Sequence, residues 1–279
     1  MRIIQMSLEQ QSKHQRKRRV HHFPMLKQRG KKIVIVTAYD YPTGLAADLA
    51  GADAILVGDS LGMVALGFGS TIPVTVEIMI HHTAAVSRAA KSAFLIADMP
   101  FMSYKISPEQ ALQTAGRLVQ EGGAEAVKLE GGEEVAPAIA KIVAAGIPVM
   151  GHVGLMPQSV HRHGGYRVQG RDEETVGELL TAAKAVEDAG AFSVVLEAVD
   201  PEVAARITAS LSIPTIGIGA GRQCDGQVLV LSDLAGMLPG DPPKFVRRYG
   251  TVFEALHHAV QAFAQDVRSG AFPGEENEY

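Results

Sequence analysis

The feature of this sequence that most restricts its fold is a series of eight short apolar runs separated by stretches with helical spacing. Short runs that are apolar throughout are typical of parallel strands covered on both faces. Eight such strands alternating with helices predict a single (β/α)8 TIM barrel of the α/β class, with an open doubly wound α/β sheet as the alternative. The runs cover residues 33–36, 54–57, 94–97, 126–129, 147–150, 193–196, 215–218 and 228–231.

The stretches between the runs carry signals for helix ends. Ser107 and Pro108 provide an N-cap and a proline at the first helical position, and Gln110 completes a capping-box pattern. The connection between residues 218 and 228 has room for a tight loop but hardly for a packed helix. Residues 243–264 have apolar positions near helical spacing and predict C-terminal helices after the barrel.

Length and composition fit one globular domain. The chain has 279 residues, of which 47% are hydrophobic and 20% charged, and barrels of this kind commonly run to about 250 residues. We expect the barrel domain to cover residues 31–279, preceded by a basic extension over residues 1–30. The basic cluster Arg16–Arg19 has no apolar stretch after it, so it is not a secretory signal. Its expected state is a solvated and partly flexible tail.

Charge and cysteine content exclude several kinds of partner. The formal net charge is -4, which provides no general attraction for nucleic acid. No apolar run reaches the roughly 18 residues of a membrane span. Cys224 is the only cysteine, which excludes an internal disulfide framework and favours the reducing cytoplasm.

Lys128 and Glu130 stand two residues apart in the fourth run and therefore share one face of a strand. A buried ammonium or carboxylate is costly unless it is paired or bound. The two side chains either form a buried ion pair with each other or lie on an exposed edge strand, or they belong to a ligand or metal site. The glycines at 131 and 132 end the strand at once, which suits a site at the mouth of a barrel.

The other runs also end in polar residues, and the carboxyl ends of barrel strands meet at one face. The residues at these ends are Asp40, Asp59, Ser60, Asp98, Lys128, Glu130, His152, Glu197, Ser232 and Asp233. Asp59, Asp98 and Glu130 come from neighbouring strands and offer only oxygen ligands, so they predict a Mg²⁺ site. Ser60 and Lys128 beside them predict an anionic substrate, which fits a 2-keto acid that chelates the metal.

Glu197, on the sixth strand, has no role in the predicted metal site. Its apolar neighbours Leu196 and Ala198 favour a general base. His152 ends the fifth strand and either orients the substrate or a metal ligand, or is a hydrogen-bonded structural histidine. For Asp40 and Asp233 we favour the role of a helix N-cap or a surface charge.

Eight stretches carry a resemblance to a known family: Thr37–Pro42, Leu56–Met63, Pro73–Thr75, Ala97–Phe101, Val127–Gly132, Gly151–Ser159, Gly217–Gly221 and Cys224–Leu229. By these stretches the sequence resembles the ketopantoate hydroxymethyltransferase family. This resemblance is specific, because several of these stretches are long and unusual. It runs from about residue 30 to the C-terminus and leaves the basic tail outside.

The resemblance implies a Mg²⁺-dependent barrel enzyme that is a cytoplasmic homodecamer. It implies transfer of a hydroxymethyl group from 5,10-methylenetetrahydrofolate to 3-methyl-2-oxobutanoate in pantothenate synthesis. By motif position, Asp59, Asp98 and Glu130 would hold Mg²⁺, and Asp59 and Asp98 would also contact the ketoacid with Ser60 and Lys128. Glu197 would be the proton acceptor.

The sequence departs from the family pattern at two positions. Gly69, in the glycine-rich loop 62–69, stands where an acidic residue is usual, and Ser232 stands where a histidine is usual. These departures concern folate contacts and closure of that loop over the site. The folate-binding residues themselves are not identified.

Two other functions fit parts of the pattern. A Mg²⁺ lyase or mutase of the phosphoenolpyruvate mutase/isocitrate lyase type also uses a barrel and a Gly-Asp-Ser stretch. Those sites typically use a cysteine in a loop in the middle of the chain, whereas Cys224 follows the seventh strand. A non-catalytic barrel would be expected to lack the carboxylates at the strand ends.

Overall fold

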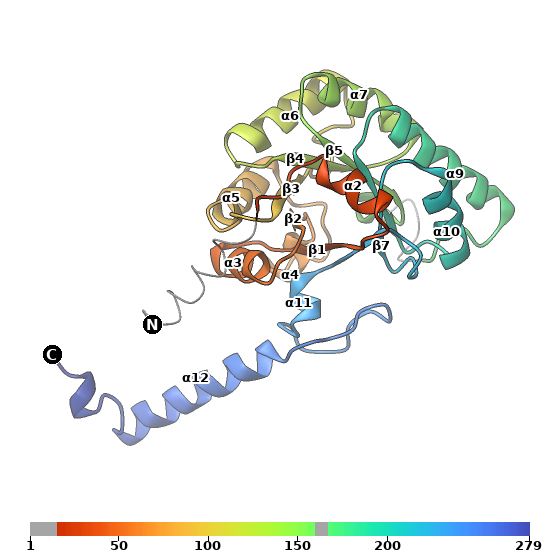
Figure 1. Ribbon diagram of the computed structural model, residues 1–279. Helices are drawn as coiled ribbons and strands as arrows, with labels where there is room; N and C mark the ends of the chain where they lie inside the picture. The colour runs from red at the N-terminus through yellow and green to blue at the C-terminus, as the bar shows by residue number, and fades with distance from the viewer. Residues whose placement is uncertain (1–15, 160–166) are drawn as a thin grey trace. The chain divides into compact units, whose positions relative to one another are not determined.

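The computed structural model describes residues 16–159 and 167–279 (Figure 1). The contacts divide the chain into two compact units, one that ends at Val230 and one over Leu231–Tyr279. Over the part of the chain that the structure describes, no helix combines the length and the apolar character needed to cross a membrane.

The first unit contains a closed barrel of eight parallel strands. Each strand pairs with the next in the sequence, and β8 returns to pair with β1. The predicted (β/α)8 barrel is therefore confirmed, and the open doubly wound sheet is excluded. The strands are β1 (Ile33–Thr37), β2 (Ala54–Val57), β3 (Phe94–Asp98), β4 (Ala126–Glu130), β5 (Val149–Gly154), β6 (Ser193–Glu197), β7 (Thr215–Ile218) and β8 (Gly226–Leu229).

The strands β5 and β8 are shifted from the predicted runs by two or more residues, whereas β1, β3, β4 and β6 only extend one residue further than predicted. β5 begins at Val149, after Pro148, because proline has no N–H to donate to a strand partner. The strand then continues to Gly154. β8 begins at Gly226, where the backbone pairs with Ile33 of β1. Residues 230 and 231, which the apolar pattern assigned to the strand, instead lead into a helix.

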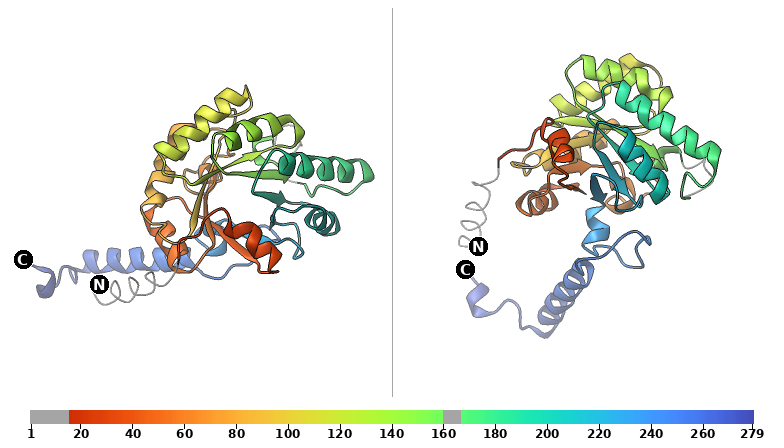
Figure 2. Two further views of the ribbon diagram at one scale, coloured as in Figure 1. Left: turned by 45° about the horizontal axis from the view of Figure 1, so that its top comes forward. Right: turned by 45° about the vertical axis from the view of Figure 1, so that its right-hand side comes forward.

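Helices form the outer layer of the barrel, and Figure 2 shows them around the strands. Within the described chain, β7 connects to β8 without a helix, as the short spacing predicted. Ser107 caps α6 by accepting a hydrogen bond from Gln110 N–H, whereas the Gln110 side chain binds Ile106 N–H instead of closing the predicted capping box. The helices of this unit are α2 (His22–Gln28), α3 (Tyr41–Leu49), α4 (Leu61–Val64), α5 (Val76–Ser87), α6 (Pro108–Gln120), α7 (Ala136–Ala144), α9 (Glu173–Asp188) and α10 (Pro201–Ser210).

Buried side chains form one core between strands and helices and a second core inside the barrel. Phe23 from α2 belongs to the inner core, where its ring centroid lies 5.4 Å from that of Phe94 and 5.3 Å from that of Phe192. Phe94 is the first residue of β3 and Phe192 immediately precedes β6. The helix α2 therefore closes the amino-terminal end of the barrel (Figure 1).

Basic residues of the N-terminal segment pair with acidic residues that immediately precede strands. Lys17 lies 2.6 Å from Glu125 before β4, and Arg18 lies 2.9 Å from Asp53 before β2. Lys27 of α2 pairs with Asp225 before β8 at 2.9 Å. Lys17 and Arg18 are thus bound to the barrel rather than solvated as the sequence suggested. The domain boundary at residue 31 stays a prediction.

Glu187, in the last turn of α9, ties this helix to the segment that enters β7. Its carboxylate accepts hydrogen bonds from Ser212 N–H, Ser212 Oγ and Ile213 N–H, and from Lys184. Burial alone would raise the pKa of Glu187, but these hydrogen bonds outweigh it and lower the pKa from 4.5 to about 2.

We expect Glu187→Gln to lower the free energy of unfolding at pH 7 by about 1–3 kcal/mol. Because the folded-state pKa of Glu187 is depressed, its contribution is complete above pH 5 and is lost as the pH falls toward 2. Denaturant unfolding at pH 7 and at pH 3 measures this, and the difference from the wild type should shrink at pH 3. Asp188→Asn is the control, since Asp188 is an exposed partner of the same lysine. Equal losses in both variants would contradict the assignment.

The second unit contains α11 (Leu231–Leu234), α12 (Val252–Ser269) and the short 3-10 helix η3 (Glu275–Asn277). The predicted C-terminal helix begins at Val252 rather than near residue 243, because residues 243–251 are irregular and join α11 to α12 through backbone hydrogen bonds. On α12, five exposed apolar side chains recur at helical spacing and form a continuous stripe: Phe253, Leu256, Val260, Phe263 and Val267.

Candidate active site

The polar residues predicted at the strand ends lie at the carboxyl-terminal mouth of the barrel. Asp59 and Ser60 follow β2 after Gly58. Asp98, Glu130 and Glu197 are the last residues of their strands, and Lys128 and His152 each lie two residues before the end of theirs. The register places Asp98 beside Lys128, and Glu130 beside His152. Because the barrel is closed and its strands are parallel, these side chains converge on one site. We call Asp59, Asp98, Lys128, Glu130, His152 and Glu197 the mouth cluster.

Lys128 forms the central ion pair of the mouth cluster with Asp98. Its Nζ lies 2.7 Å from Asp98 Oδ1, and both side chains are almost completely buried. The other oxygen of Asp98 accepts a hydrogen bond of 3.0 Å from the backbone N–H of Asp59. Lys128 therefore forms its ion pair with Asp98 on the neighbouring strand and not with Glu130 on its own strand.

His152 lies between the two glutamates of the mouth cluster. Its Nε2 is 3.3 Å from Glu197 Oε2, and its Nδ1 is 3.7 Å from Glu130 Oε1 and 3.3 Å from Lys128 Nζ. Burial, and then the nearby charge of Lys128, lower the pKa of His152. The imidazole is therefore neutral at pH 7, and the proton that fits these neighbours is on Nε2, facing Glu197.

Glu197 is placed by a constrained piece of backbone. Ala198, the next residue, has a left-handed φ of 47°, which is unfavourable for alanine. Backbone hydrogen bonds hold it there, from Leu155 N–H to Glu197 O at 2.8 Å and from Ala198 N–H to Ile218 O at 2.9 Å. Gly154 pairs with Glu197 so closely that a side chain at Gly154 would collide with the Glu197 carbonyl. The surroundings thus hold the Glu197 main chain in one conformation.

Ser60 belongs to a chain of hydroxyl groups beside the mouth cluster. Its Oγ lies 2.8 Å from the hydroxyl of Tyr39, which also accepts a hydrogen bond of 2.8 Å from Thr37 Oγ1. Gly58 is required here, because a Cβ at this position would lie 2.9 Å from Ser60 Oγ and 3.4 Å from Asp98 Oδ2. The Gly-Asp-Ser turn therefore packs directly against β3.

Burial and mutual repulsion shift the protonation of the carboxylates. Burial, and then Asp98, raise the pKa of Asp59 to about 7. Burial, and then Asp59, raise the pKa of Glu130 well above its usual value. Burial opposes the charge of Lys128, but the carboxylates around it outweigh this effect and raise its pKa, so that it stays protonated. Four carboxylates face one ammonium, and their repulsion is relieved either by proton uptake, as the raised pKa values indicate, or by a bound cation.

The donor set fits Mg²⁺ that is held partly by a substrate. Across residues 16–159 and 167–279, no three His, Cys, Asp or Glu side chains group closely enough to bind a metal ion on their own. Mg²⁺ usually binds through one or two carboxylates and completes its shell with water and substrate oxygens. Burial and neighbouring carboxylates raise the pKa values of Asp59 and Glu130 even though Lys128 lowers them, and a metal ion bound beside them would lower these pKa values further.

Other residues that we predicted at strand ends lie outside the cluster or have structural contacts. Asp40 caps α3 by accepting a hydrogen bond from Thr43 N–H, as predicted. Asp233 lies in the first turn of α11, and Ser232 is buried in the same short helix. Sequence analysis missed Gln158 and Tyr104, which contact Asp59 and Glu130. Both belong to loops without periodicity, and only the similar stretch Gly151–Ser159 drew attention to Gln158.

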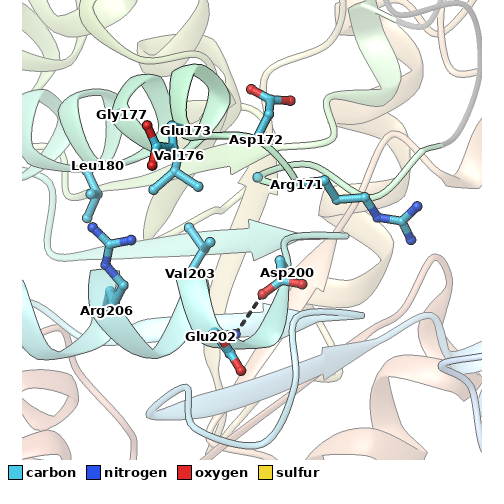
Figure 3. Close-up of a pocket in the computed structure, with 11 residues that line it drawn as sticks. Arg171, Asp172, Glu173, Val176, Gly177, Leu180, Asp200, Glu202, Val203 and Arg206 are labelled. Carbon is cyan, nitrogen blue, oxygen red and sulfur yellow. Dashed lines mark hydrogen bonds between the residues drawn. The ribbon is translucent and has the colours of Figure 1, made fainter.

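A separate groove of about 800 Å³ lies on the outer layer between the N-terminal parts of α9 and α10 (Figure 3). Charged side chains, among them Arg171 and Arg206, line it together with Val176 and Val203. None of the mouth cluster lines this groove. It is therefore not the site formed by the strand ends.

Comparisons with known proteins agree with this geometry. A family model described as ketopantoate hydroxymethyltransferase matches residues 17–275 and thus includes part of the basic segment that we placed outside the resemblance. The chain is 56% identical over 254 residues to the 3-methyl-2-oxobutanoate hydroxymethyltransferase of Carboxydothermus hydrogenoformans, which covers 91% of this chain and 92% of that protein.

Solved structures of other enzymes share the fold. A phosphonopyruvate hydrolase in complex with oxalate and Mg²⁺ has a TM-score of 0.59 at 15% identity and covers 92% of both chains. A 2,3-dimethylmalate lyase of the phosphoenolpyruvate mutase/isocitrate lyase superfamily has a TM-score of 0.58 at 18% identity and covers 93% of this chain and 90% of that chain. At these identities the likeness establishes the barrel and not the reaction.

Proposed function

Because the chain belongs to the ketopantoate hydroxymethyltransferase family, we propose that it transfers a hydroxymethyl group from 5,10-methylenetetrahydrofolate to 3-methyl-2-oxobutanoate. The products are ketopantoate (2-dehydropantoate) and tetrahydrofolate, in the synthesis of pantothenate, a precursor of coenzyme A. The chain is an enzyme of this family, because relatives named 3-methyl-2-oxobutanoate hydroxymethyltransferase match about nine-tenths of its length. The observation that carries the proposal is the buried mouth cluster, with its excess of carboxylates around one lysine.

In this proposal Asp59, Asp98 and Glu130 hold Mg²⁺. When bound there, the ion acts as a Lewis acid toward the 2-oxo group of the ketoacid and makes the C3 hydrogen more acidic. The excess negative charge of the cluster and the oxygen-only donors support this choice of metal. Among the described residues these carboxylates do not group closely enough to hold an ion unaided, so the ketoacid and water would have to complete the shell of the metal.

Ser60 and Lys128 are proposed to bind the ketoacid, together with Asp59 and Asp98. The protonated Lys128 attracts the anionic substrate to a site that is otherwise negative. Its ion pair with Asp98 fixes the ammonium in place before the substrate arrives. The Ser60 hydroxyl, held by Tyr39, is a hydrogen-bond donor for a carboxylate oxygen.

Glu197 is proposed as the general base. It accepts the C3 proton of the ketoacid, and the electron pair of that C–H bond forms the new C–C bond to the methylene carbon of the folate. Both bonds from that carbon to the folate nitrogens break, and water supplies the hydroxyl group. The proton taken up by Glu197 and one proton of the water end on the two nitrogens of tetrahydrofolate. The neutral His152 lies between the two glutamates, with its Nε2 3.3 Å from Glu197 Oε2 and its Nδ1 3.7 Å from Glu130 Oε1.

Turnover measured with 3-methyl-2-oxobutanoate and 5,10-methylenetetrahydrofolate, with and without Mg²⁺, tests this function. We expect ketopantoate to form only when the metal is present. Turnover that is unchanged in a chelator would contradict the metal assignment. No turnover of this pair at any metal concentration would contradict the function itself.

Replacing Glu130 with alanine is expected to shift the Mg²⁺ dependence of turnover to about 10–100-fold higher concentrations, the usual effect of disturbing a metal site. Glu133→Ala is the matched control, because Glu133 is an exposed glutamate three residues further along the chain. A metal titration of Glu130→Ala that overlays that of the control would remove Glu130 from the metal site.

We also propose that the protein is a homo-oligomer. The apolar stripe of α12 supports this, because five large apolar side chains on one helix face rarely remain in water. The number of subunits, for which the family resemblance implies ten, stays a prediction, as does a cytoplasmic location.

A further inference from the structure

Gln158 is a buried polar residue at the mouth of the barrel that the proposed chemistry does not use. It lies in the short 3-10 helix η2 (Pro157–Ser159), which follows β5, and only 3% of it is exposed. A buried amide is costly unless its donors and acceptor are satisfied. Its partners therefore indicate what it does.

The donors of Gln158 reach two carboxylates of the mouth cluster. Its Nε2 donates to Asp59 Oδ2 at 2.9 Å and to the Met99 carbonyl at 3.0 Å. Its backbone N–H donates to Glu130 Oε2 at 3.1 Å. One residue thus binds one oxygen of a carboxylate after β2 and one oxygen of a carboxylate at the end of β4.

Tyr104 fixes the orientation of the Gln158 amide. The Tyr104 hydroxyl donates to Gln158 Oε1 at 2.8 Å and accepts from the backbone N–H of Glu130 at 3.2 Å. In this orientation Oε1 accepts from the Tyr104 hydroxyl, and Nε2 donates to Asp59 and to the Met99 carbonyl. Rotating the side-chain amide by 180° would turn Oε1 toward the Asp59 carboxylate. That arrangement would bring two acceptors together, so only one orientation of the amide fits.

We propose that Gln158, held by Tyr104, is a positioning residue that fixes Asp59 and Glu130 so that each presents its second oxygen to Mg²⁺ and the ketoacid. This inference rests on the proposed function, since it assigns a role toward the same metal. Groups that orient metal ligands typically contribute about 10–100-fold to metal affinity. The contribution arises because the free carboxylates no longer need to be ordered when the ion binds.

Gln158→Met tests the proposal, because methionine has nearly the same size and removes only the side-chain hydrogen bonds. Calorimetric titration of the full-length protein with Mg²⁺ alone should show about 10–100-fold weaker binding, while thermal unfolding shows that the variant is folded. Raising the Mg²⁺ concentration should restore much of the turnover. Gln110→Met is the matched control, since the Gln110 side chain on α6 binds backbone groups of the loop before the helix and contacts no carboxylate of the mouth cluster, so Mg²⁺ affinity should stay unchanged.

Tyr104→Phe provides a second and smaller change that removes one hydroxyl. We expect it to weaken Mg²⁺ binding less than Gln158→Met does, and we expect the double variant to bind no more weakly than Gln158→Met alone. Mg²⁺ affinity within twofold of the wild type in folded Gln158→Met would overturn the inference. If that variant does not fold, unchanged affinity in Tyr104→Phe would overturn it. A wild-type protein that neither binds Mg²⁺ nor turns over the ketoacid would instead refute the proposed function.

Discussion

Replacing Glu197 with glutamine is expected to stop exchange of the C3 hydrogen of 3-methyl-2-oxobutanoate with solvent. Glutamine keeps the size of the side chain but cannot accept a proton, and loss of a general base typically costs about 10²–10⁴-fold in rate. Glu197 is suited to this role because its side chain is 19% exposed, whereas those of Asp98 and Glu130 are at most 4% exposed. Among these carboxylates it is the one that reaches the open side of the cluster.

Proton NMR of the ketoacid in D₂O, without a folate donor, measures this exchange directly. The variant should still bind Mg²⁺ and the ketoacid within a few-fold of the wild type, which calorimetry can establish. Glu202→Gln is the control, since Glu202 is exposed at the start of α10 and lines the outer groove instead. Exchange at the wild-type rate in Glu197→Gln would contradict the assignment of Glu197 as the general base.

Replacing Lys128 with methionine is expected to destabilise the protein by about 3–5 kcal/mol, the usual cost of removing one partner of a buried ion pair. Lys128 is 5% exposed and lies 2.7 Å from Asp98. Without it, Asp59, Asp98 and Glu130 would remain buried with no nearby positive charge. Affinity for the ketoacid should fall as well, because the site would lose the group that attracts its carboxylate.

The pH dependence of this variant gives an independent check. Lys128 lowers the pKa of Asp59 and of Glu130, so its removal raises both further above their unfolded values. The folded variant then binds more protons than the unfolded chain, and its stability falls as the pH rises. The deficit relative to the wild type should therefore be larger at pH 8 than at pH 5.

Lys141→Met is the matched control for Lys128→Met. Lys141 pairs with Glu109 on the surface, where both side chains are largely exposed, so the change should stay within about 0.5 kcal/mol. Denaturant unfolding of both variants at the two pH values separates a buried charge from a surface one. A Lys128→Met protein as stable as the control at pH 8 would contradict the claim that the charge of Lys128 stabilises the buried carboxylates.

The strand-end residues could be predicted because two regularities are strong enough to be seen in the sequence. The apolar runs mark parallel strands, and parallel strands in a closed barrel bring their carboxyl ends to one face. Asp98, Lys128 and Glu197 therefore lie in one site although long stretches of chain separate them. The alternation of side chains along β4 likewise predicts that Lys128 and Glu130 share a face.

The pairing of charges inside the site is a matter of distances in three dimensions, and spacing along the chain does not predict it. Lys128 and Glu130 could have formed an ion pair, yet the register between β3 and β4 places Asp98 against the lysine. Glu130 is instead held by Gln158 and lies near His152. Burial then raises the pKa of this carboxylate, an effect that depends on the whole surrounding fold.

Loops and chain ends were the least predictable parts, for a related reason. Gln158, Tyr104 and Phe23 lie in segments without a hydrophobic period, so no local pattern indicates that these side chains are buried. Periodicity and strand order were sufficient to predict the barrel and the residues at its mouth. The partner of each charge, the amide that holds two carboxylates and the aromatic residue that closes the other end depend on contacts between distant segments, which exist only once the chain has folded.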